Sequence, residues 1–224
     1  IKPKLSEIIA HTAVTSYFLF HKSTSHILFD QYWLQLFILY DIINNVVVRY
    51  NGQRHKEVIL MIKEEMKQHR CCFTGHRPQK LNHSKRKIKC LLEKAIDDAI
   101  AKGYVTFITG MAEGTDIWAA EIVLKKRKRN DNLHLICAVP HPGFENRRSI
   151  YEKLKYKNII KKADFVKIVS ENYYRGCYQK RNEFMADRSS LVIAVFNGEP
   201  SGTKNTVDYA KRKGIAVVNV LDNI

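Results

Sequence analysis

Apolar positions in the last two thirds of the chain follow two alternating patterns. Spacings of three and four, as at Ile88, Leu92 and Ile96, predict amphipathic helices. Between such segments lie short, mainly apolar runs rich in Val and Ile, at residues 71–74, 105–109, 134–139, 165–170, 191–196 and 215–220. Runs of this kind are typical of strands buried on both faces of a parallel sheet. The alternation predicts an α/β fold over residues 70–224, with a Rossmann-like, mostly parallel sheet flanked by helices.

The first 69 residues have a different pattern. They are rich in aromatic and branched apolar side chains, and the spacing of Leu28, Tyr32, Leu36 and Tyr40 is typical of an amphipathic helix. We therefore expect a helical appendage over residues 1–69. It would pack on the main domain or on a second subunit, as in a homo-oligomer, and recruitment of a protein partner is the alternative. Its role is otherwise open.

Several features bear on location. Residues 27–50 form the most apolar stretch, but Asp30 and Asp41 interrupt it, so it falls short of the uninterrupted run that a membrane span needs. The first residues lack the order of a signal peptide, in which charged residues come first, an apolar segment follows, and small residues mark the cleavage site. The five cysteines are an odd number without metal-ligand spacing, which predicts free thiols in a reducing compartment and no metal site. We expect a cytoplasmic protein without a membrane partner.

Composition and charge narrow the class of partner. Of the 224 residues, 45% are apolar and 27% charged, which excludes a disordered or fibrous chain. The formal net charge of +16 favours anionic partners such as nucleotides, nucleic acid or anionic lipid, without choosing among them. Part of this charge lies in residues 125–129, where a helix is expected to end, and cations there complement the helix dipole.

Ligands of open α/β sheets bind outside the carboxyl ends of the strands, so the residues that follow each predicted strand matter most. Two glycine-bracketed loops open directly into predicted helices, where free backbone N–H groups and the helix dipole favour a phosphate. The first contains Gly110, Met111, Ala112, Glu113, Gly114, Thr115 and Asp116, and the second contains Gly198, Ser201, Gly202, Thr203 and Thr206. A capping role for Thr115 or Asp116 is compatible with ligand binding.

Two further segments add polar groups at the same edge. The first predicted strand is followed by donors for an anion, and a later helix start is dense in groups that bind ribose or phosphate. The residues selected from these two segments are Thr74, Gly75, His76, Arg77, Arg181, Asn182 and Asp187. No catalytic role is assigned to His141, because a lone loop histidine is more often a hydrogen-bonding residue.

These motifs, in this order, resemble the YpsA-like branch of the SLOG superfamily. The resemblance begins at Cys72 and takes in residues 74–77, residues 110–116, Arg181 with Met185, and residues 201–206. The superfamily also contains the DprA DNA-processing proteins and the Lonely-guy phosphoribohydrolases. The resemblance implies a Rossmann-like fold and a pocket for a nucleotide or a ligand derived from NAD or ADP-ribose. It does not cover the appendage.

The resemblance also bears on catalysis. The phosphoribohydrolase branch carries a glutamate after its second glycine loop, and the matching position here is Thr206. An N-glycosidic hydrolase would therefore need a substitute carboxylate, for which Glu113, Asp116 and Glu121 are the candidates. The sequence leaves open whether any reaction is catalysed.

Three functions follow from these observations. The favoured hypothesis is binding or sensing of a nucleotide-like small molecule, or of an NAD- or ADP-ribose-derived one, through the glycine-rich loops. The first alternative is a phosphoribohydrolase-like hydrolase of a nucleotide. The second, ranked last, is binding of single-stranded DNA as in DprA-like proteins, because the α/β part shows no basic stripe interleaved with aromatic residues.

Overall fold

The computed structural model describes residues 53–146 and 148–223. Most of the predicted appendage, residues 1–52, lies outside the described residues, and the described chain begins with helix α3 (Gln53–Gln68). From Ile59 onward the chain forms one compact unit.

All six predicted strands are present, and every neighbouring pair is parallel. They are β1 (Arg70–Gly75), β2 (Thr106–Thr109), β3 (His134–Val139), β4 (Phe165–Ile168), β5 (Leu191–Val195) and β6 (Ala216–Asn219). Their order across the sheet is β4-β3-β2-β1-β5-β6. The predicted Rossmann-like α/β fold is confirmed. The chain reverses its direction of travel across the sheet between β1 and β5, which makes this pair the topological switch point.

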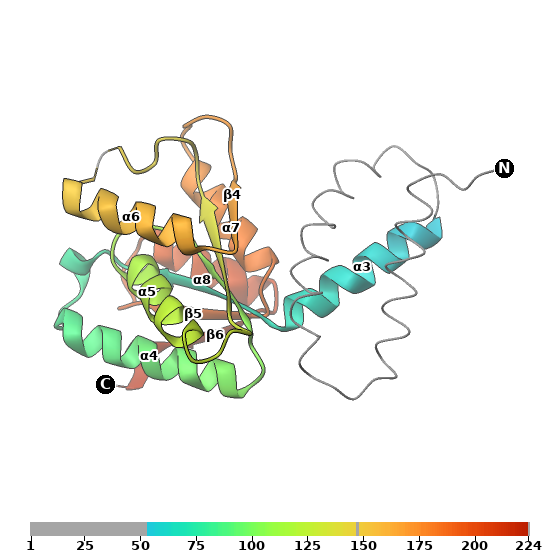
Figure 1. The fold of residues 1–224 in the computed structure, drawn as a ribbon, viewed down its shortest axis with the longest axis horizontal. Helices are drawn as coiled ribbons and strands as arrows, with labels where there is room; N and C mark the ends of the chain where they lie inside the picture. Colours follow the sequence, from blue (N-terminus) through green and yellow to red (C-terminus); the bar gives the residue numbers. More distant parts are fainter. Residues whose placement is uncertain (1–52, 147, 224) are drawn as a thin grey trace. The chain divides into compact units, whose positions relative to one another are not determined.

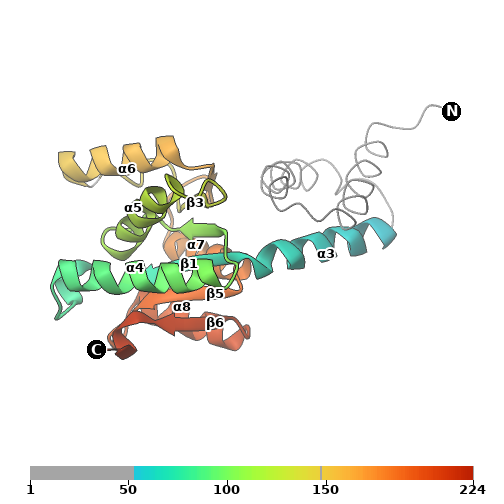
Figure 2. The ribbon, with the colours of Figure 1, turned by 60° about the horizontal axis from the view of Figure 1, so that its bottom comes forward.

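Helices cover both faces of the sheet. Helices α4 (Lys85–Ala101), α5 (Thr115–Arg127) and α6 (Ile150–Lys162) form one layer, in front of the sheet in Figure 1. Helices α7 (Cys177–Asp187) and α8 (Gly202–Arg212) form the layer behind it. Figure 2 shows the sheet between the two layers. The short 3-10 helices η3 (Pro78–Lys80) and η4 (Val220–Asn223) follow β1 and β6.

The core lies mainly between the sheet and the layer of α4, α5 and α6. The rings of Phe73 and Phe107 stack there with their centroids 5.9 Å apart. The predicted apolar face of α4 covers them, since Ile88, Leu92 and Ile96 are all buried. Burial of such side chains is the main stabilising contribution to this fold.

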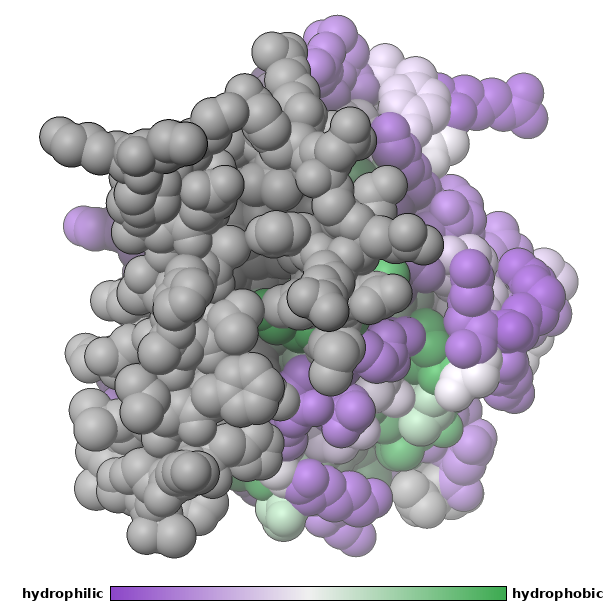
Figure 3. All heavy atoms as spheres, turned by 90° about the vertical axis from the view of Figure 1, so that its right-hand side faces the viewer, coloured by the Kyte–Doolittle hydropathy of each residue, from purple (hydrophilic) through white to green (hydrophobic). Residues whose placement is uncertain are grey.

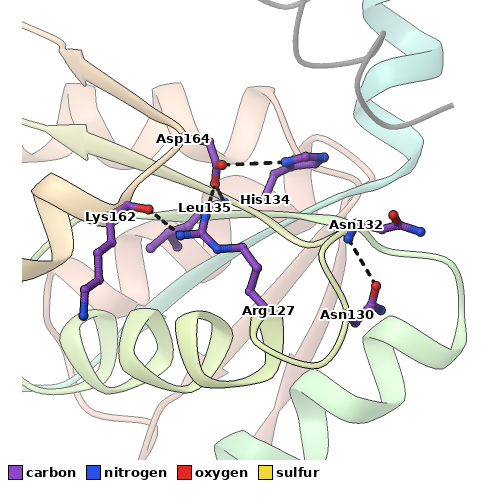
Figure 4. A network of polar contacts seen from close by, with 7 residues as sticks. All are labelled: Arg127, Asn130, Asn132, His134, Leu135, Lys162 and Asp164. Atoms are coloured by element: carbon purple, nitrogen blue, oxygen red, sulfur yellow. Dashed lines mark hydrogen bonds and ion pairs between the residues drawn. The ribbon is translucent and has the colours of Figure 1, made fainter. Parts of the chain in front are cut away.

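At the amino edge of the sheet, one carboxylate connects the ends of four elements (Figure 4). The Asp164 carboxylate accepts a hydrogen bond from the Leu135 amide at 2.7 Å. It also forms an ion pair with Arg127 at 2.5 Å. Arg127 also donates to the Lys162 carbonyl at 2.6 Å, and His134 lies 3.9 Å from the carboxylate. Although burial raises the pKa of Asp164, these neighbours hold it below its usual value.

The basic run has a structural role at the end of α5. Lys125, Lys126 and Arg127 occupy the last turn of this helix, as expected for cations that complement the helix dipole. Lys126 also pairs with Asp97 at 2.6 Å.

Away from the grey atoms, the face of the molecule in Figure 3 is mainly hydrophilic. Within the described ranges, no helix has the length and apolar character to span a membrane.

Candidate functional site

The carboxyl ends of β1 and β5 meet at the switch point. Side chains alternate along a strand, so Thr74 and His76 lie on the face covered by α7 and α8, whereas Gly75 faces α5. The His76 amide donates to the Val195 carbonyl at 3.0 Å, which ties the end of β1 to β5. The loop after β5 is joined to the residues after β1 as well, because the Asn197 side chain donates to the Lys80 carbonyl at 3.1 Å.

His76 is a buried histidine with an unused nitrogen. Its ring lies 5.4 Å from the Phe196 ring, and its Nε2 atom is enclosed without a hydrogen-bond partner. Burial of the ring, and then the positive charge of Lys80, lower the pKa of His76. The adjacent Arg77 is exposed. The end of β1 therefore offers one enclosed and one exposed nitrogen donor group for an anion.

The start of α8 is open. The Ser201 side chain caps this helix by accepting from the Lys204 amide at 3.1 Å. The preceding amides of Gly202 and Thr203 belong to the first turn, which has no intrahelical acceptors. A Cβ atom at Gly202 would meet nothing within 4 Å. Thr203 is buried, and Gly198 in the preceding loop has φ 92°, a conformation that favours glycine.

The first glycine loop uses its own donors internally. The Met111 amide donates to Thr109 Oγ1 at 3.2 Å, and the Ala112 amide donates to Asp116 Oδ2 at 3.0 Å. Thr109 Oγ1 in turn donates to the Asp116 carbonyl at 3.0 Å. Met111 is buried with φ 60°, so the loop is tightly wound. The Met111 and Ala112 amides, which the sequence suggested for phosphate, are thus engaged within the loop.

Two glycines of the predicted site, Gly75 after β1 and Gly114 in the first glycine loop, make room for protein side chains. A Cβ atom at Gly75 would lie 2.6 Å from Thr115 Cβ, and a Cβ atom at Gly114 would lie 2.8 Å from Pro78 Cδ. Thr115 is buried at the start of α5, and its Oγ1 atom has no hydrogen-bond partner. The start of α5 is therefore packed directly against the end of β1, beside the switch point.

Arg181 and Asp116 are buried opposite charges. Arg181 donates to the Gly110 carbonyl and, through Nε, to Asn182 Oδ1 at 2.9 Å. Burial raises the pKa of Asp116, while Arg181 and then Arg148 act in the opposite direction. Burial likewise lowers the pKa of Arg181, and Asp116 opposes that shift. Both groups support the first glycine loop from inside.

The structure separates other predicted residues from this edge. Asp187 ends α7 and accepts from Tyr209 at 2.8 Å, so it lies at the opposite end of that helix from the strand ends. Glu121 points away from the loops and pairs with Lys89 at 3.0 Å and with Lys155 at 3.7 Å. Thr206 donates to the Gly202 carbonyl at 2.8 Å within α8.

The three candidate catalytic carboxylates do not converge. Asp116 is held by the Ala112 amide, and Glu121 by two lysines of neighbouring helices. Glu113 is half-buried in the loop, where it acts to lower the pKa of Glu152 and to raise the pKa of Arg148. In the part of the chain that the structure describes, no group of three His, Cys, Asp or Glu residues could hold a metal ion. The edge has the chemistry of an anion site, with donors from His76, Arg77 and the start of α8.

An aromatic cluster at the ends of β3 and β4 was not predicted. It consists of His141, Phe144, Tyr173 and Tyr178, whose ring centroids lie 5.3–6.1 Å apart in five pairs. Arg148 covers the Phe144 ring at 4.9 Å and donates to the Met111 carbonyl. The sequence signal was the density of tyrosines after the fourth strand, but only the fold brings them to His141.

A groove of about 350 Å³ lies elsewhere, between α5 and α6. Five cations and Glu121 line it, away from the carboxyl ends of the strands. Arg127 in this groove is paired with Asp164, and Lys155 with Glu121. We therefore place the candidate site at the strand ends, where unused polar atoms and helix amides gather, and not in this groove.

Two solved structures match this chain. DNA processing protein A from Streptococcus pneumoniae matches with a TM-score of 0.50 and 20% identity, covering 68% of this chain and 50% of that chain. DNA processing protein A from Helicobacter pylori, which is described as binding single-stranded DNA, matches with a TM-score of 0.48 and 18% identity, covering 72% of this chain and 73% of that chain. At 20% identity, the match to the Streptococcus pneumoniae protein supports the fold alone. The match to the Helicobacter pylori protein is too weak to support a conclusion about this chain.

Bacterial relatives match more closely in sequence. The SPbeta prophage-derived protein YoqJ of Bacillus subtilis is 33% identical over 144 residues, which cover 58% of this chain and 84% of that protein. A UPF0398 protein of Staphylococcus epidermidis is 28% identical over 115 residues, and the match spans only 57% of its length. The profile of the YpsA family, described as the YspA SLOG family, matches residues 71–217. Because that match contains the whole sheet up to β6 and every glycine-rich loop at its carboxyl edge, the chain belongs to the YspA SLOG family.

Proposed function

We propose that the protein binds a phosphate-bearing, nucleotide-like ligand at the carboxyl ends of β1 and β5. The single observation that carries this proposal is the enclosed Nε2 atom of His76, which has no hydrogen-bond partner, at the carboxyl edge of the sheet where α8 also begins. A buried polar atom without a partner costs free energy, so each such atom calls for an explanation, and a ligand that supplies the missing partner is one. The switch point is also the place where open α/β sheets bind ligands.

The ligand would be a nucleotide or an NAD- or ADP-ribose-derived molecule. Its phosphate would accept hydrogen bonds from the amides of Gly202 and Thr203, assisted by the positive end of the α8 dipole. His76 and Arg77 would add donors from the end of β1. Thr115 Oγ1, unpartnered and packed against Gly75, is one more donor at this edge.

The proposal is binding without turnover. Hydrolysis of an N-glycosidic bond needs a carboxylate that is free to act on the ribose or on a water molecule. Asp116 and Glu121 are engaged by protein partners, and Thr206 holds the position where the phosphoribohydrolases carry their glutamate. A partner protein would then recognise the ligand-bound form, as in a sensor.

The experiment uses isothermal titration of the full chain with inorganic phosphate, AMP, NAD and ADP-ribose, followed by mass spectrometry of each mixture. The key variant is Gly202→Asp, which places a carboxylate at the phosphate position. The structure has room for it, and an acidic residue in the first turn favours the helix by about 0.3–1 kcal/mol. The matched control is Asn132→Asp, with the same charge change at an exposed residue of the amino edge.

We expect at least one ligand to bind and to be recovered intact. Gly202→Asp should weaken that binding at least about 10-fold, because like charges repel at close range, whereas Asn132→Asp should leave it unchanged. Recovery of a free base or of nicotinamide would replace the proposal with the hydrolase. Absence of binding across the panel, or equal binding by Gly202→Asp, would refute it.

Single-stranded nucleic acid is the second candidate, favoured by the net charge of +16 and by the exposed tyrosines after β4. Binding of this kind releases counterions, so its affinity should fall steeply as salt concentration rises. Titration of a short labelled oligonucleotide at two salt concentrations tests it. An affinity independent of salt, or no affinity, would exclude this candidate.

A further inference from the structure

The tyrosines of the aromatic cluster at the ends of β3 and β4 are exposed, unlike the buried aromatic rings of the hydrophobic core. Tyr173 and Tyr178 are 58% and 40% exposed, and the neighbouring Tyr174 is 44% exposed. Aromatic rings gain most from burial, so a group of them held at the surface marks a binding surface. Every residue from Glu171 to Gly176 is exposed, so Tyr173 and Tyr174 project from a surface segment, and Tyr178 lies in the first turn of α7.

The floor of this cluster is fixed. Phe144 is half-buried between the cluster and Tyr156 of α6, with ring centroids 6.5 Å apart. Arg148 lies 4.9 Å from the Phe144 ring centre and Arg181 lies 6.0 Å from it. Cations over a ring in a partly dry environment hold it in place. Tyr178, whose ring centroid lies 5.8 Å from that of Phe144, thus rests on an aromatic base that two arginines hold.

Two polar atoms beside the cluster lack partners. His141 Nδ1 lies 2.8 Å from the Pro142 carbonyl, which can only accept, so Nδ1 carries the proton in the neutral ring. Nε2 is then a bare acceptor, and it is enclosed without a hydrogen-bond donor. Ser170 Oγ, just after β4, is likewise buried and unpartnered. An aromatic surface with an acceptor and a hydroxyl at its edge suits a nucleobase that carries an exocyclic amino group.

We propose that Tyr173, Tyr178 and His141 form a stacking site for the amino-bearing nucleobase of the ligand. This inference rests on the proposed function and extends it from the phosphate to the base. The base would stack on the tyrosine rings and donate its amino group to His141 Nε2. Tyr173 packs edge-on to His141, with ring centroids 5.3 Å apart, so the stacking surface and the acceptor lie side by side.

The position of the cluster sets the size of the ligand. Arg181 joins the cluster to the Gly110 loop at the end of β2, and Thr115 joins that loop to the end of β1. β3 lies two strands from β1, a separation of about 10 Å at about 4.8 Å per strand, and α8 starts beyond it. A ligand that reaches both places carries more than one phosphate or a second ribose. ADP-ribose should therefore bind more tightly than AMP.

The test compares ADP-ribose, its hypoxanthine analogue and inorganic phosphate by isothermal titration of the full chain. The variant is the double change Tyr173→Leu and Tyr178→Leu, which keeps apolar side chains but removes the planar rings. The control is Tyr151→Leu, at a tyrosine on α6 that is 66% exposed and lies outside the cluster. Unfolding midpoints of all three proteins check that the fold is kept.

We expect the double variant to weaken ADP-ribose binding roughly 10-fold or more, as loss of base stacking does, without changing phosphate binding. Tyr151→Leu should bind both probes like the original chain, and the hypoxanthine analogue should bind more weakly than ADP-ribose. Equal ADP-ribose binding by the double variant overturns this inference while the phosphate site stands.

Other outcomes identify a different failure. If the original chain binds neither phosphate nor ADP-ribose, the proposed function itself fails. A third arm uses a short oligodeoxyadenylate. Tyrosine-dependent binding of this oligonucleotide, with no binding of ADP-ribose, would assign the stacked base to a single strand and overturn the nucleotide form of the inference.

Discussion

The guanidinium group of Arg181 lies directly against the backbone of Gly110, so that a Cβ atom at residue 110 would be 2.6 Å from Arg181 Cζ. The same guanidinium donates to the Gly110 carbonyl. The glycine at the end of β2 is thus explained by a protein side chain from α7. This contact holds the loop after β2 to the opposite helical layer, and it joins the aromatic cluster to the rest of the strand ends.

Gly110→Ala should destabilise the protein. Arg181 is 5% exposed and cannot move aside freely, so the added methyl group overpacks the site at a cost of about 1–3 kcal/mol. Gly202→Ala is the matched control: nothing lies within 4 Å of its Cβ position, and restriction of the unfolded chain should stabilise the protein by about 0.4–1 kcal/mol. Urea unfolding measures both. Equal midpoints for the two variants would contradict the packing argument.

Asp164 should make stability depend on acid pH. Its folded pKa lies below its ordinary value of 3.8, so its contribution is present above pH 3.8 and is lost as pH falls through the folded pKa. Asp164→Asn should cost about 1–2 kcal/mol at pH 7, a value reduced for partial exposure. The difference between the two proteins should shrink below pH 3.8. If the difference in unfolding free energy between the two proteins stays constant from pH 7 to pH 3, the lowered pKa of Asp164 does not stabilise the fold.

His76 should make anion binding depend on pH. Burial lowers its pKa below 6.5, followed by the effect of Lys80, while Asn197 and Glu199 act in the opposite direction, so the ring is neutral at pH 7. A charged ring attracts an anion more strongly, and sulfate, which does not titrate in this range, should bind more tightly as pH falls below 6.5. His76→Gln should abolish the increase. Sulfate-dependent thermal shifts from pH 8 to pH 5 measure it.

The same shift predicts a stability change without ligand. Because the folded pKa of His76 is depressed, its neutral form contributes stability above pH 6.5 that is lost as pH falls through the folded pKa. His76→Gln should therefore lose less stability than the original chain between pH 7 and pH 5. Parallel curves for the two proteins would show that the ring is not desolvated as the structure has it.

Thr206→Glu should not restore the hydrolase. Thr206 is 1% exposed and donates to the Gly202 carbonyl, so a glutamate there would bury an unpaired carboxylate at a cost of several kcal/mol. We expect a large fall in the urea midpoint and no release of base from AMP. Thr206→Ser, which keeps the hydroxyl, is the control and should remain close to the original stability. A Thr206→Glu protein as stable as the original chain would contradict the burial argument.

The sequence by itself determined the fold and led to the edge of the sheet where we place the candidate site. A strand buried on both faces must be short and apolar, and a helix with one buried face must repeat every three to four residues, as Ile88, Leu92 and Ile96 do. These are local constraints, so they are legible in the order of residues. Glycine loops at strand ends then follow from parallel connectivity, which brings the carboxyl ends together.

Only the tertiary structure decided how each polar group of these loops is used. Asp116 turns inward to the Ala112 amide, Glu121 pairs with lysines of two other helices, and Asp187 lies at the far end of α7. The partners of Glu121 and Asp187 come from other helices, and no local pattern encodes them. The same reason hid the meeting of Tyr173 with His141. Local order sets which elements form, whereas burial and pairing between distant elements select the groups that remain free for a ligand.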